Sequence, residues 1–457
     1  MTRFERLAFH LYGVLMRLLC PWVRHRLTAR SAIQPLLASQ LEERFGVYDA
    51  RLFVQGAQAA WIWVHAVSLG ETRAAGLLMA ELRRQHPALR FLLTHGTATG
   101  REAGSRLLGP GDLQVWQPWD AAPAVQRFLD HFKPQLALMI ETEVWPHWVQ
   151  GCLARGIPMC LVNARLSEKS FRSAKRLAWL AKPAYQGLTA VWAQTADDAL
   201  RLGALGAKVQ GALGNVKFDA KPNAAQSFVG HQARRARSNV SILLASSRPG
   251  EEDMFLQAIL AMPNDLRETA SFLCVPRHPE RFERIAMQFE ACGGELVRRS
   301  SFATLQAFAH ALDLTLQTPV RDSSPDPLRP VQRRPRMFLG DSMGEMSFYY
   351  ALANVALMGA TFEPLGGQNL IEALANGCPV VLGPSTYNFQ DAAAMALSAG
   401  VARSSETLAQ GLQLALKWAH AQTDWVQATE RCSDFISEHQ GASQSLAMAL
   451  EPYLPKA

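Results

Sequence analysis

Apolar residues dominate short runs along the chain, and the stretches between these runs repeat apolar positions at helical spacing. Runs of this kind are typical of strands buried on both faces of a parallel sheet, with helices as the connections between them. In the first half of the chain the pattern predicts strands at 60–68, 89–97, 113–119, 135–143, 157–165 and 190–195. Helices are predicted among the connections at 71–85, 99–108 and 120–132.

A second alternating series follows a polar, basic stretch at 220–239 that has no strand character. Its predicted strands are 240–247, 271–277, 294–300, 313–318, 336–341, 354–360 and 379–384. Helical sequence continues from about residue 405, and the Pro- and Arg-rich stretch 321–336 is expected to form an exposed hairpin or loop. Two doubly wound α/β domains, with the ligand in the cleft at the carboxyl ends of their strands, account for this order.

The N-terminal stretch 4–22 has apolar residues at helical spacing, but Arg3, Arg6 and Arg17 interrupt or flank it. A spanning helix needs roughly 20 largely uncharged residues, so this stretch is not expected to cross a membrane. It also lacks the small-residue cleavage site of a secretory signal. We expect an amphipathic helix with a basic polar face that lies on an anionic leaflet. The alternative is a helix docked on its own domain.

The expected organisation follows from these patterns. It consists of an N-terminal membrane-associated helical segment at 1–45, a first domain at 46–222, a linker at 223–238, a second domain at 239–425, and a C-terminal helical segment at 426–457 that packs back on the first domain.

The net charge of the chain indicates the kind of partner it binds, and the spacing of its cysteines bears on metal sites and disulfides. The 457 residues carry a net charge of +7 and a pI near 9.1, which favours acidic partners such as nucleic acid, an anionic membrane or a phosphorylated substrate. The seven cysteines are scattered without a C-x-x-C pair or a Cys/His cluster, so neither a zinc site nor a disulfide framework is indicated. A reducing, cytoplasmic setting is the simplest interpretation.

The pattern Ser-x-x-Glu occurs at the end of a predicted strand in each domain, as Ser68 to Glu71 and as Ser342 to Glu345. Both fit a capping box, in which the serine caps a helix and the glutamate reaches back to a backbone amide. The functional alternative is that Glu71 faces the cleft as a general base. A helix N-terminus lowers the pKa of a carboxylate, so burial or a second carboxylate would have to raise it again.

A second carboxylate is available where "LMIETEVWPHW" ends another predicted strand with Glu141 and Glu143. If the strand continued, these two side chains would point to opposite faces, so only one would face the cleft easily. A metal site made of both acids and His147 has little support, because no D-x-D or H-E-x-x-H completes it. The remaining alternatives are a cleft carboxylate near Glu71 and a strand-end acid held by backbone amides.

In the second domain, "VPRHPERF" places Arg277 at a strand end, where it can clamp a phosphate or remain an exposed solubilising residue. The stretch 358–384 leads from a strand to Gly366-Gly367, then to a helix start with Glu372 in its first turn. Glycine amides and a helix N-terminus form a phosphate cradle, and a glutamate one turn later can accept ribose hydroxyls. The absence of G-K-[ST] and of G-x-G-x-x-G removes the main support for ATPase and dehydrogenase functions.

Taken together, these residues resemble a known family. Seven motifs occur in the family's order over nearly the whole chain: "HAVSLGET", "ETEVWPHW", "NARLSEKS", "GALGNVKFD", "VPRHPERF", "GDSMGEM" and "GGQNLIEALANGCPVVLGP". They are similar to the 3-deoxy-D-manno-octulosonic acid (Kdo) transferases of glycosyltransferase family 30. The resemblance implies an α/β GT-B fold of two Rossmann-like domains, and an inverting transfer of Kdo from CMP-Kdo to the lipid A precursor.

The resemblance also implies roles for residues of this chain. Glu71 corresponds to the proton acceptor, while Glu141 and Lys217 correspond to stabilisers of the transition state. The positions implied to hold CMP are Pro276, Arg277, Met343, Gly344, Glu345, Asn369, Leu370, Ile371 and Glu372. No cofactor or metal ion is expected. The expected partners are CMP-Kdo, the lipid A precursor and the cytoplasmic leaflet of the inner membrane, with no nucleic acid.

Two other functions fit parts of the pattern. Another GT-B glycosyltransferase or a nucleotide-sugar epimerase would use a UDP-sugar, and competition between donors separates it from a Kdo transferase. A basic membrane-surface or nucleic-acid-binding protein would interleave aromatic with basic residues. The Arg clusters at 234–237 and 329–336 lack that interleaving and are expected to be solvated loops.

Overall fold

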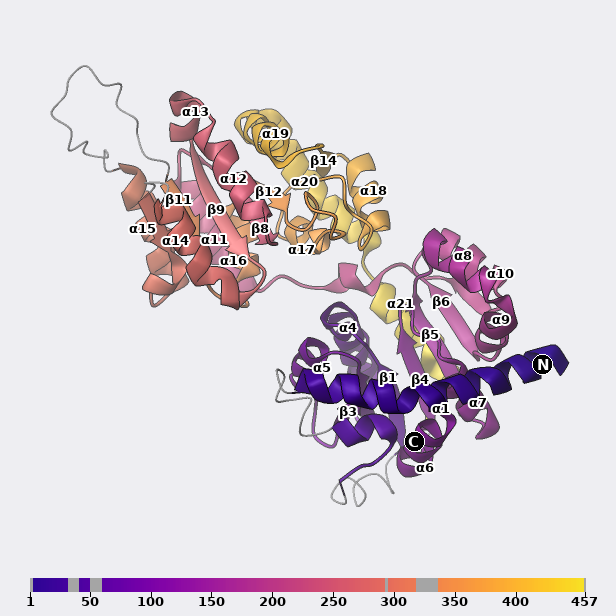
Figure 1. Ribbon diagram of the computed structural model, residues 1–457. Coiled ribbons are helices and arrows are strands. Elements are labelled where there is room, and N and C mark those ends of the chain that lie inside the picture. Colours follow the sequence, from indigo (N-terminus) through magenta and orange to yellow (C-terminus); the bar gives the residue numbers. More distant parts are fainter. Residues whose placement is uncertain (1–2, 32–40, 50–59, 292–294, 318–335, 456–457) are drawn as a thin grey trace, which may run out of the picture. The chain divides into compact units, whose positions relative to one another are not determined.

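The structure, a computed structural model, describes residues 3–31, 41–49, 60–291, 295–317 and 336–455. The chain divides into two compact units (Figure 1). Unit 1 comprises Met1–Asp219 and His439–Ala457, and unit 2 comprises Ala220–Glu438. The predicted loop at 321–336 lies almost wholly outside the described residues.

Unit 1 contains a parallel sheet of seven strands in the order β3-β2-β1-β4-β5-β6-β7. The strands are β1 (Trp61–His65), β2 (Arg90–His95), β3 (Leu113–Trp116), β4 (Leu136–Ile140), β5 (Met159–Ala164), β6 (Ala190–Ala193) and β7 (Val209–Ala212). Its helices are α1 (Arg3–Ser31), η1 (Leu41–Phe45), α4 (Leu69–Gln85), α5 (Ala98–Ser105), α6 (Ala122–Phe132), α7 (Pro146–Ala154), α8 (Glu168–Arg176), α9 (Ala178–Gln186), α10 (Ala196–Ala204), η2 (Val216–Asp219), α21 (Ala442–Leu450) and η5 (Glu451–Tyr453).

Unit 2 contains a second parallel sheet of seven strands in the order β10-β11-β9-β8-β12-β13-β14. The strands are β8 (Val240–Ser247), β9 (Ala270–Pro276), β10 (Glu295–Arg298), β11 (Arg336–Leu339), β12 (Val355–Met358), β13 (Val380–Leu382) and β14 (Ala402–Ser404). Its helices are α11 (Ala224–Ala236), α12 (Glu251–Leu260), α13 (Asn264–Glu268), η3 (Pro279–Arg281), α14 (Phe282–Ala291), η4 (Arg299–Ser301), α15 (Leu305–Gln317), α16 (Met346–Leu352), α17 (Leu370–Ala375), α18 (Gln390–Ser398), α19 (Leu408–His420) and α20 (Gln422–His439).

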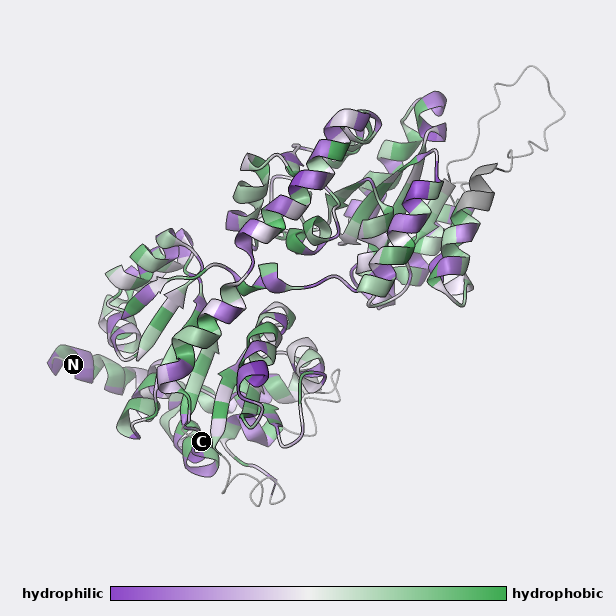
Figure 2. Ribbon diagram, turned by 180° about the vertical axis from the view of Figure 1, so that it is seen from behind, coloured by the Kyte–Doolittle hydropathy of each residue, from purple (hydrophilic) through white to green (hydrophobic). Residues whose placement is uncertain are grey.

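Both faces of the sheet in unit 1 are buried, which is why its strands are almost wholly apolar. Along β1, Trp61 and Trp63 enter one core cluster, while Ile62 and Val64 enter the cluster on the opposite face. Successive side chains of a strand point to opposite faces, so a strand covered on both sides needs apolar residues throughout. In Figure 2 the strands of this sheet are drawn mostly as hydrophobic, and helices cover them.

The predicted strand at 313–318 is wrong, because this stretch ends helix α15 at Gln317. The alternation of "DLTLQT" imitates a strand, but the preceding Phe308 and Leu312 are fully buried at the helical spacing of four residues. The prediction also missed β7 and β14. Each lies at one edge of its sheet and is short and only partly buried, so it lacks the continuous apolar run on which the prediction depended.

The boundary between the units lies earlier than the expected linker. Most of the stretch 223–238 forms helix α11, and this helix packs on α16 in unit 2. Asn223 caps this helix by accepting a hydrogen bond from the Gln226 amide at 3.1 Å. The polar and basic composition that suggested a linker is therefore the exposed side of a capped helix. At the other end of the chain, α21 belongs to unit 1, where it packs on α4 and η2.

Candidate active site

Glu71 lies in the first turn of α4, directly after β1. Ser68 is the N-cap of this helix, and its hydroxyl accepts a hydrogen bond from the Glu71 amide at 3.4 Å. The Glu71 carboxylate accepts from the Val67 amide at 2.6 Å and from the Ser68 hydroxyl at 3.3 Å. The predicted capping pattern is therefore present, although the carboxylate reaches Val67, one residue before the cap.

The turn that bears Glu71 is held from the neighbouring strand. Thr97, which follows β2 and caps α5, donates a hydrogen bond from its hydroxyl to the Val67 carbonyl at 2.8 Å. A side chain at Gly100 would come within 2.8 Å of the same carbonyl, so only glycine allows this close approach. These contacts fix the carbonyl of Val67, whose amide binds Glu71.

Glu141 and Lys217 form an ion pair in the same unit. The Lys217 Nζ lies 2.7 Å from the Glu141 Oε1, and both side chains are largely buried, with 16% and 11% of their surface exposed. Glu141 follows β4 and has a positive φ of 65°, so the strand does not continue through it. The condition under which Glu141 and Glu143 would point to opposite faces, a strand that continues through them, is therefore not met.

Strand order brings Glu141 close to Glu71. Strand β4 pairs with β1 in parallel, with Met139 opposite His65, so both acids follow the carboxyl ends of adjacent strands. Burial raises the pKa of Glu71 to about 7, with the negative charge of Glu141 as the next cause and Glu143 a smaller one, against the lowering effect of the Val67 amide. A carboxyl group with a pKa near neutral can accept and release a proton at physiological pH.

The residues of unit 2 that the resemblance implies for CMP follow the carboxyl ends of its central strands. Pro276 ends β9, and the Arg277 amide donates to the Ser247 carbonyl at the end of β8 at 3.1 Å. The turn with Met343, Gly344 and Glu345 follows β11 and precedes α16. Because β11, β9, β8 and β12 are consecutive in this sheet, these loops meet at one edge.

The second Ser-x-x-Glu turn does not form the predicted capping box. Glu345 is itself the N-cap of α16 and makes no side-chain capping hydrogen bond. Its carboxylate accepts from the Arg299 Nη2 at 2.8 Å and from the Ser342 hydroxyl. Gly344 has a φ of +79°, and nothing within 4 Å would contact a side chain there, so this position faces open space.

The stretch after β12 makes the predicted glycine turn and helix start. Gly366 and Gly367 both have positive φ, at 86° and 83°, and Asn369 caps α17 by accepting from the Ile371 amide at 3.2 Å. Leu370 and Ile371 are each only 1% exposed, so they offer a ligand only their backbone. Among the implied positions of this stretch, Asn369 and Glu372 are the ones whose side chains are partly exposed.

Arg248, which belongs to none of the predicted sites, lies beside the residues implied to bind the donor. It follows β8, and its Nη1 lies 2.6 Å from the Nε2 of His278, which comes directly after Arg277. The sequence does indicate Arg248: in "ASSRPGEED" it is the first basic residue after a buried strand, which is also the position of Arg277 after its own strand.

No group of three or more His, Cys, Asp or Glu side chains that could hold a metal ion occurs among the residues that the structure describes. His147, considered above as a ligand, instead stacks on Tyr12 of α1 with ring centroids 5.2 Å apart. Its Nδ1 lies 3.5 Å from the Asp120 carboxylate.

Comparisons with known proteins agree on one family. Residues 39–220 match the family model described as 3-deoxy-D-manno-octulosonic-acid transferase (kdotransferase). The chain is 41% identical to the 3-deoxy-D-manno-octulosonic acid transferase of Bordetella pertussis, over 90% of this chain and 91% of the relative. It is 27% identical to the enzyme of that name from Haemophilus influenzae, over 93% and 94% of the two chains.

Solved structures agree on the fold. HepE of Anabaena, in complex with UDP, aligns with a TM-score of 0.52 and 12% identity, over 86% of this chain and 99% of that one. The UDP-GlcNAc 2-epimerase of Neisseria meningitidis aligns with a TM-score of 0.50 and 14% identity, over 86% and 100%. With two parallel seven-stranded sheets, each flanked by helices, the fold class is GT-B.

Proposed function

The chain belongs to the 3-deoxy-D-manno-octulosonic acid (Kdo) transferase family, and we propose that it moves Kdo from CMP-Kdo to the lipid A precursor lipid IVA. It is a glycosyltransferase, and Kdo transfer is a step of lipopolysaccharide biosynthesis. The observation that carries the proposed mechanism is the cluster in unit 1, where Glu71 has a pKa raised to about 7 beside the ion pair of Glu141 and Lys217.

The proposed reaction is a single inverting displacement. A sugar hydroxyl of the acceptor attacks the anomeric carbon of Kdo, the bond from that carbon to the CMP phosphate oxygen breaks, and CMP leaves with the bonding electrons. Glu71, ionised at the start, takes the proton of the attacking hydroxyl as general base. Glu141 and Lys217 stabilise the charges that develop in the transition state, and their pairing at 2.7 Å fixes both side chains in advance.

Unit 2 is proposed to hold the donor through the edge of its sheet where β11, β9, β8 and β12 end. Arg277 balances the single phosphate of CMP, because a guanidinium binds a phosphate through paired hydrogen bonds. Asn369 and Glu372 are proposed to bind the nucleoside, and the turn at Met343–Glu345 completes the surface. With one phosphate and a cationic side chain to meet it, no metal ion is required by this proposal.

The test uses the purified full chain with CMP-Kdo and lipid IVA, and mass spectrometry of the lipid product. Addition of one or of two Kdo masses supports the proposal and also gives the number of residues transferred. UDP-sugars in place of CMP-Kdo serve as the matched donor control. A product formed from a UDP-sugar, with none from CMP-Kdo, would contradict the proposal and favour another GT-B activity.

We also propose that α1 attaches the enzyme to the membrane that contains its acceptor. One side of α1 is docked on unit 1 through the buried Ala8, Met16 and Val23, and Tyr12 donates a hydrogen bond to Asp120 at 2.6 Å. A neighbouring side of the helix leaves a continuous apolar stripe in solvent: Phe4, Leu7, Leu11, Val14, Leu15, Leu18 and Trp22, each at least 40% exposed. Helix α1 is therefore compatible with both interpretations of the N-terminal sequence, a helix on a membrane surface and a helix docked on its own domain.

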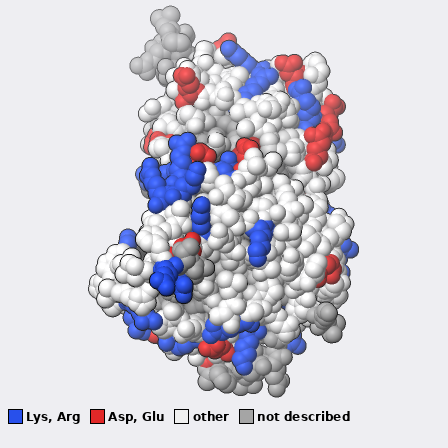
Figure 3. All heavy atoms as spheres, turned by 90° about the vertical axis from the view of Figure 1, so that its right-hand side faces the viewer, with Lys and Arg blue, Asp and Glu red and all other residues white. Residues whose placement is uncertain are grey.

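Basic side chains accompany the apolar stripe. Helix α8 has no buried residue and exposes Lys169, Arg172, Lys175 and Arg176, and it contacts α9, which in turn contacts α1. Figure 3 shows the side of the molecule on which α8 and the start of α1 lie in Figure 1. Basic side chains gather on this side. No helix among the described residues is long and apolar enough to cross a membrane. Apolar and basic residues on one surface suit the interface of an anionic leaflet.

Co-sedimentation with vesicles of phosphatidylglycerol and phosphatidylcholine tests this attachment. The double variant Leu18→Glu and Trp22→Glu is expected to lose most of its binding. Leu200→Glu on α10 is the matched control, because Leu200 and Leu18 are both 73% exposed in the same unit. Equal binding by the double variant and the wild type would overturn the proposal for α1.

A further inference from the structure

Lys217 lies on η2, a single helical turn that is held at both ends by residues far away in the sequence. At its start, the Val216 amide donates to the Oδ1 of Asn163 at 3.1 Å. Within the turn, the Lys217 amide donates to the Asn215 side chain at 3.0 Å. Such a short turn has little stability of its own, because too few hydrogen bonds form within it, so its position depends on these outside contacts.

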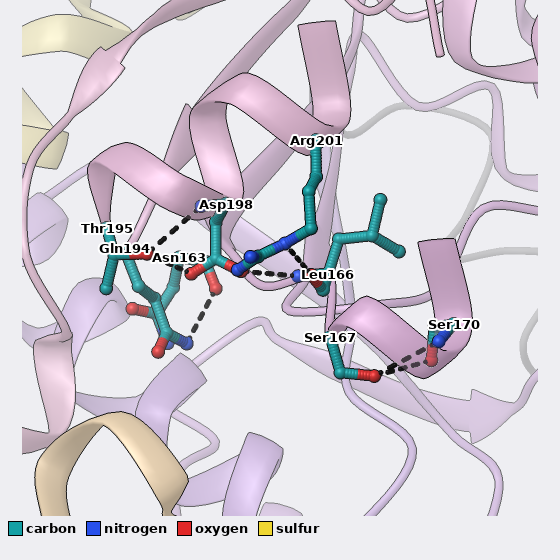
Figure 4. A network of polar contacts seen from close by, with 8 residues as sticks. All are labelled: Asn163, Leu166, Ser167, Ser170, Gln194, Thr195, Asp198 and Arg201. Carbon is teal, nitrogen blue, oxygen red and sulfur yellow. Dashed lines mark hydrogen bonds and ion pairs between the residues drawn. The ribbon is translucent and has the colours of Figure 1, made fainter. Parts of the chain in front are cut away.

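Asn163 is placed for this contact by strand β5 and the loop that follows. It is 2% exposed and has a φ of +51°, a left-handed conformation that asparagine tolerates better than most residues. The Gln194 side chain donates to the Asn163 carbonyl at 3.0 Å. Figure 4 shows this contact beside the Asp198 carboxylate, which accepts from the Leu166 amide at 2.8 Å and so ties the loop after β5 to α10.

At its other end, η2 caps a helix from the C-terminal end of the chain. The Asp219 carboxylate accepts from the amides of Gly441 and Ser443, each at 2.6 Å, at the start of α21. Gly441, the N-cap of α21, supplies no side-chain capping bond of its own, so Asp219 takes the place of the cap residue. Phe218 stacks on His439, with ring centroids 5.0 Å apart.

We propose that Asn163 and Asp219 are positioning residues that hold Lys217 against Glu141. Asn163 fixes the amide before Lys217, and Asp219 fixes the end of the same turn to α21. The chain leaves unit 1 after Asp219 and returns to it at His439, so both connections to unit 2 begin beside this turn. The two anchors keep the Lys217 ammonium in place whatever those connecting segments do.

The inference rests on the proposed function, since it assigns Asn163 and Asp219 to the same reaction as Lys217. The variants that test it are Asn163→Gly, which keeps the left-handed backbone accessible and removes only the side chain, and Asp219→Ala. Each is expected to lower kcat for Kdo transfer by about 10- to 100-fold, because a shift of roughly 1 Å in a catalytic group has an effect of this size. The KM for CMP-Kdo is expected to change little, and Asp219→Asn, which keeps one acceptor oxygen, should recover part of the rate.

Combination with Lys217→Ala separates positioning from a general loss of structure. If Asp219 acts through Lys217, then Asp219→Ala has almost no further effect on kcat in the Lys217→Ala background. The matched control is Thr407→Ala, which removes the N-cap of α19 in unit 2, and its small effect should be the same in both backgrounds. Equal fold-losses for Asp219→Ala with and without Lys217 would overturn the proposal.

A readout that needs no activity keeps this inference distinct from the proposed function. Hydrogen–deuterium exchange, followed by mass spectrometry of the peptides over 213–219 and 439–445, should rise in Asp219→Ala and stay unchanged in Thr407→Ala. Unchanged exchange in Asp219→Ala would overturn the anchoring itself. A wild type that does not transfer Kdo would overturn the proposed function, while the exchange result would still show whether η2 is anchored as described.

Discussion

Glu71 and Glu345 stand at the same position of the same four-residue pattern, one in each unit, and their side chains meet different neighbours. The Glu71 carboxylate accepts hydrogen bonds from the Val67 amide and the Ser68 hydroxyl, and burial, followed by the nearby charge of Glu141, raises its pKa to about 7. The Glu345 carboxylate is bound by the guanidinium of Arg299, whose side chain is only 10% exposed. One carboxylate therefore faces a like charge, and the other faces a partner of opposite charge.

The difference shows that the local pattern determines the turn but not the chemistry of its carboxylate. In unit 1 the neighbour that matters, Glu141, follows a strand that pairs with β1 across a long crossover. In unit 2 the neighbour is Arg299, which belongs to η4 after the edge strand β10. A carboxylate whose pKa is raised by burial and by a second carboxylate can take up a proton near pH 7, whereas loss of one that is held by a largely buried guanidinium leaves that guanidinium without its charged partner.

The largest effect is expected from removing Glu71, the proposed proton acceptor. Glu71→Gln should lower kcat for Kdo transfer by roughly 10³-fold, within the range of about 10²- to 10⁴-fold that a general base contributes. The amide can still accept from Val67, so the fold is expected to persist, as circular dichroism can check. Glu345→Gln is the matched variant; because Glu345 belongs to the proposed donor surface, its effect should fall on the KM for CMP-Kdo, while kcat stays near that of the wild type. A Glu71→Gln enzyme with near-normal turnover would assign Glu71 to helix capping alone.

The sequence was sufficient to predict most strands and the turn at Glu71, because both depend on local patterns. Buried runs such as that around Trp63 mark strands directly, and Ser68 with Glu71 marks a helix start. From the sequence one could say only that burial or a second carboxylate would be needed to raise the pKa of Glu71. Whether Glu141 lies close enough depends on the strand order that places β4 beside β1. The roles of Asn163 and Asp219 were not predicted, because both depend on contacts between distant segments.

The pH dependence of the reaction is expected to report the carboxylate pair. As the pH rises through about 7, Glu71 loses its proton, so kcat/KM should rise and then level off. Glu141→Gln removes the neighbouring negative charge, so the pKa of Glu71 falls and the rise should move to lower pH, although the plateau is lower. Glu345→Gln should leave the midpoint unchanged. An unchanged midpoint in Glu141→Gln would show that the charge of Glu141 does not raise the pKa of Glu71.

The free energy of unfolding should change in opposite directions in Glu71→Gln and in Glu345→Gln. Between the ordinary pKa of 4.5 and about 7, folded Glu71 keeps a proton that the unfolded chain has lost, so stability falls as the pH rises through this window. Glutamine carries no charge at any pH, and Glu71→Gln should therefore gain stability relative to the wild type between about pH 4.5 and about pH 7, with no further gain above that. Thermal unfolding at a series of pH values measures this change.

For Glu345→Gln the expected change is a loss of about 1–3 kcal/mol, because the Arg299 guanidinium loses its charged partner in a largely buried place. Calorimetry of the full chain at pH 8 measures both variants under one condition. A stabilising Glu345→Gln, or a Glu71→Gln variant whose relative stability does not depend on pH, would contradict the contrast between the two turns.

The smallest effect distinguishes the serines of the two turns. Ser68 caps α4 by accepting from the Glu71 amide, so Ser68→Ala should cost about 1 kcal/mol and raise hydrogen exchange in the first turn of α4. Ser342 is not the cap of α16; its hydroxyl donates to the Glu345 carboxylate and lies 3.1 Å from the Tyr349 hydroxyl. Ser342→Ala should therefore leave exchange in the first turn of α16 unchanged. If both variants loosened their helices equally, the two turns would be capped alike, and the difference between Glu71 and Glu345 would rest on Glu141 and Arg299 alone.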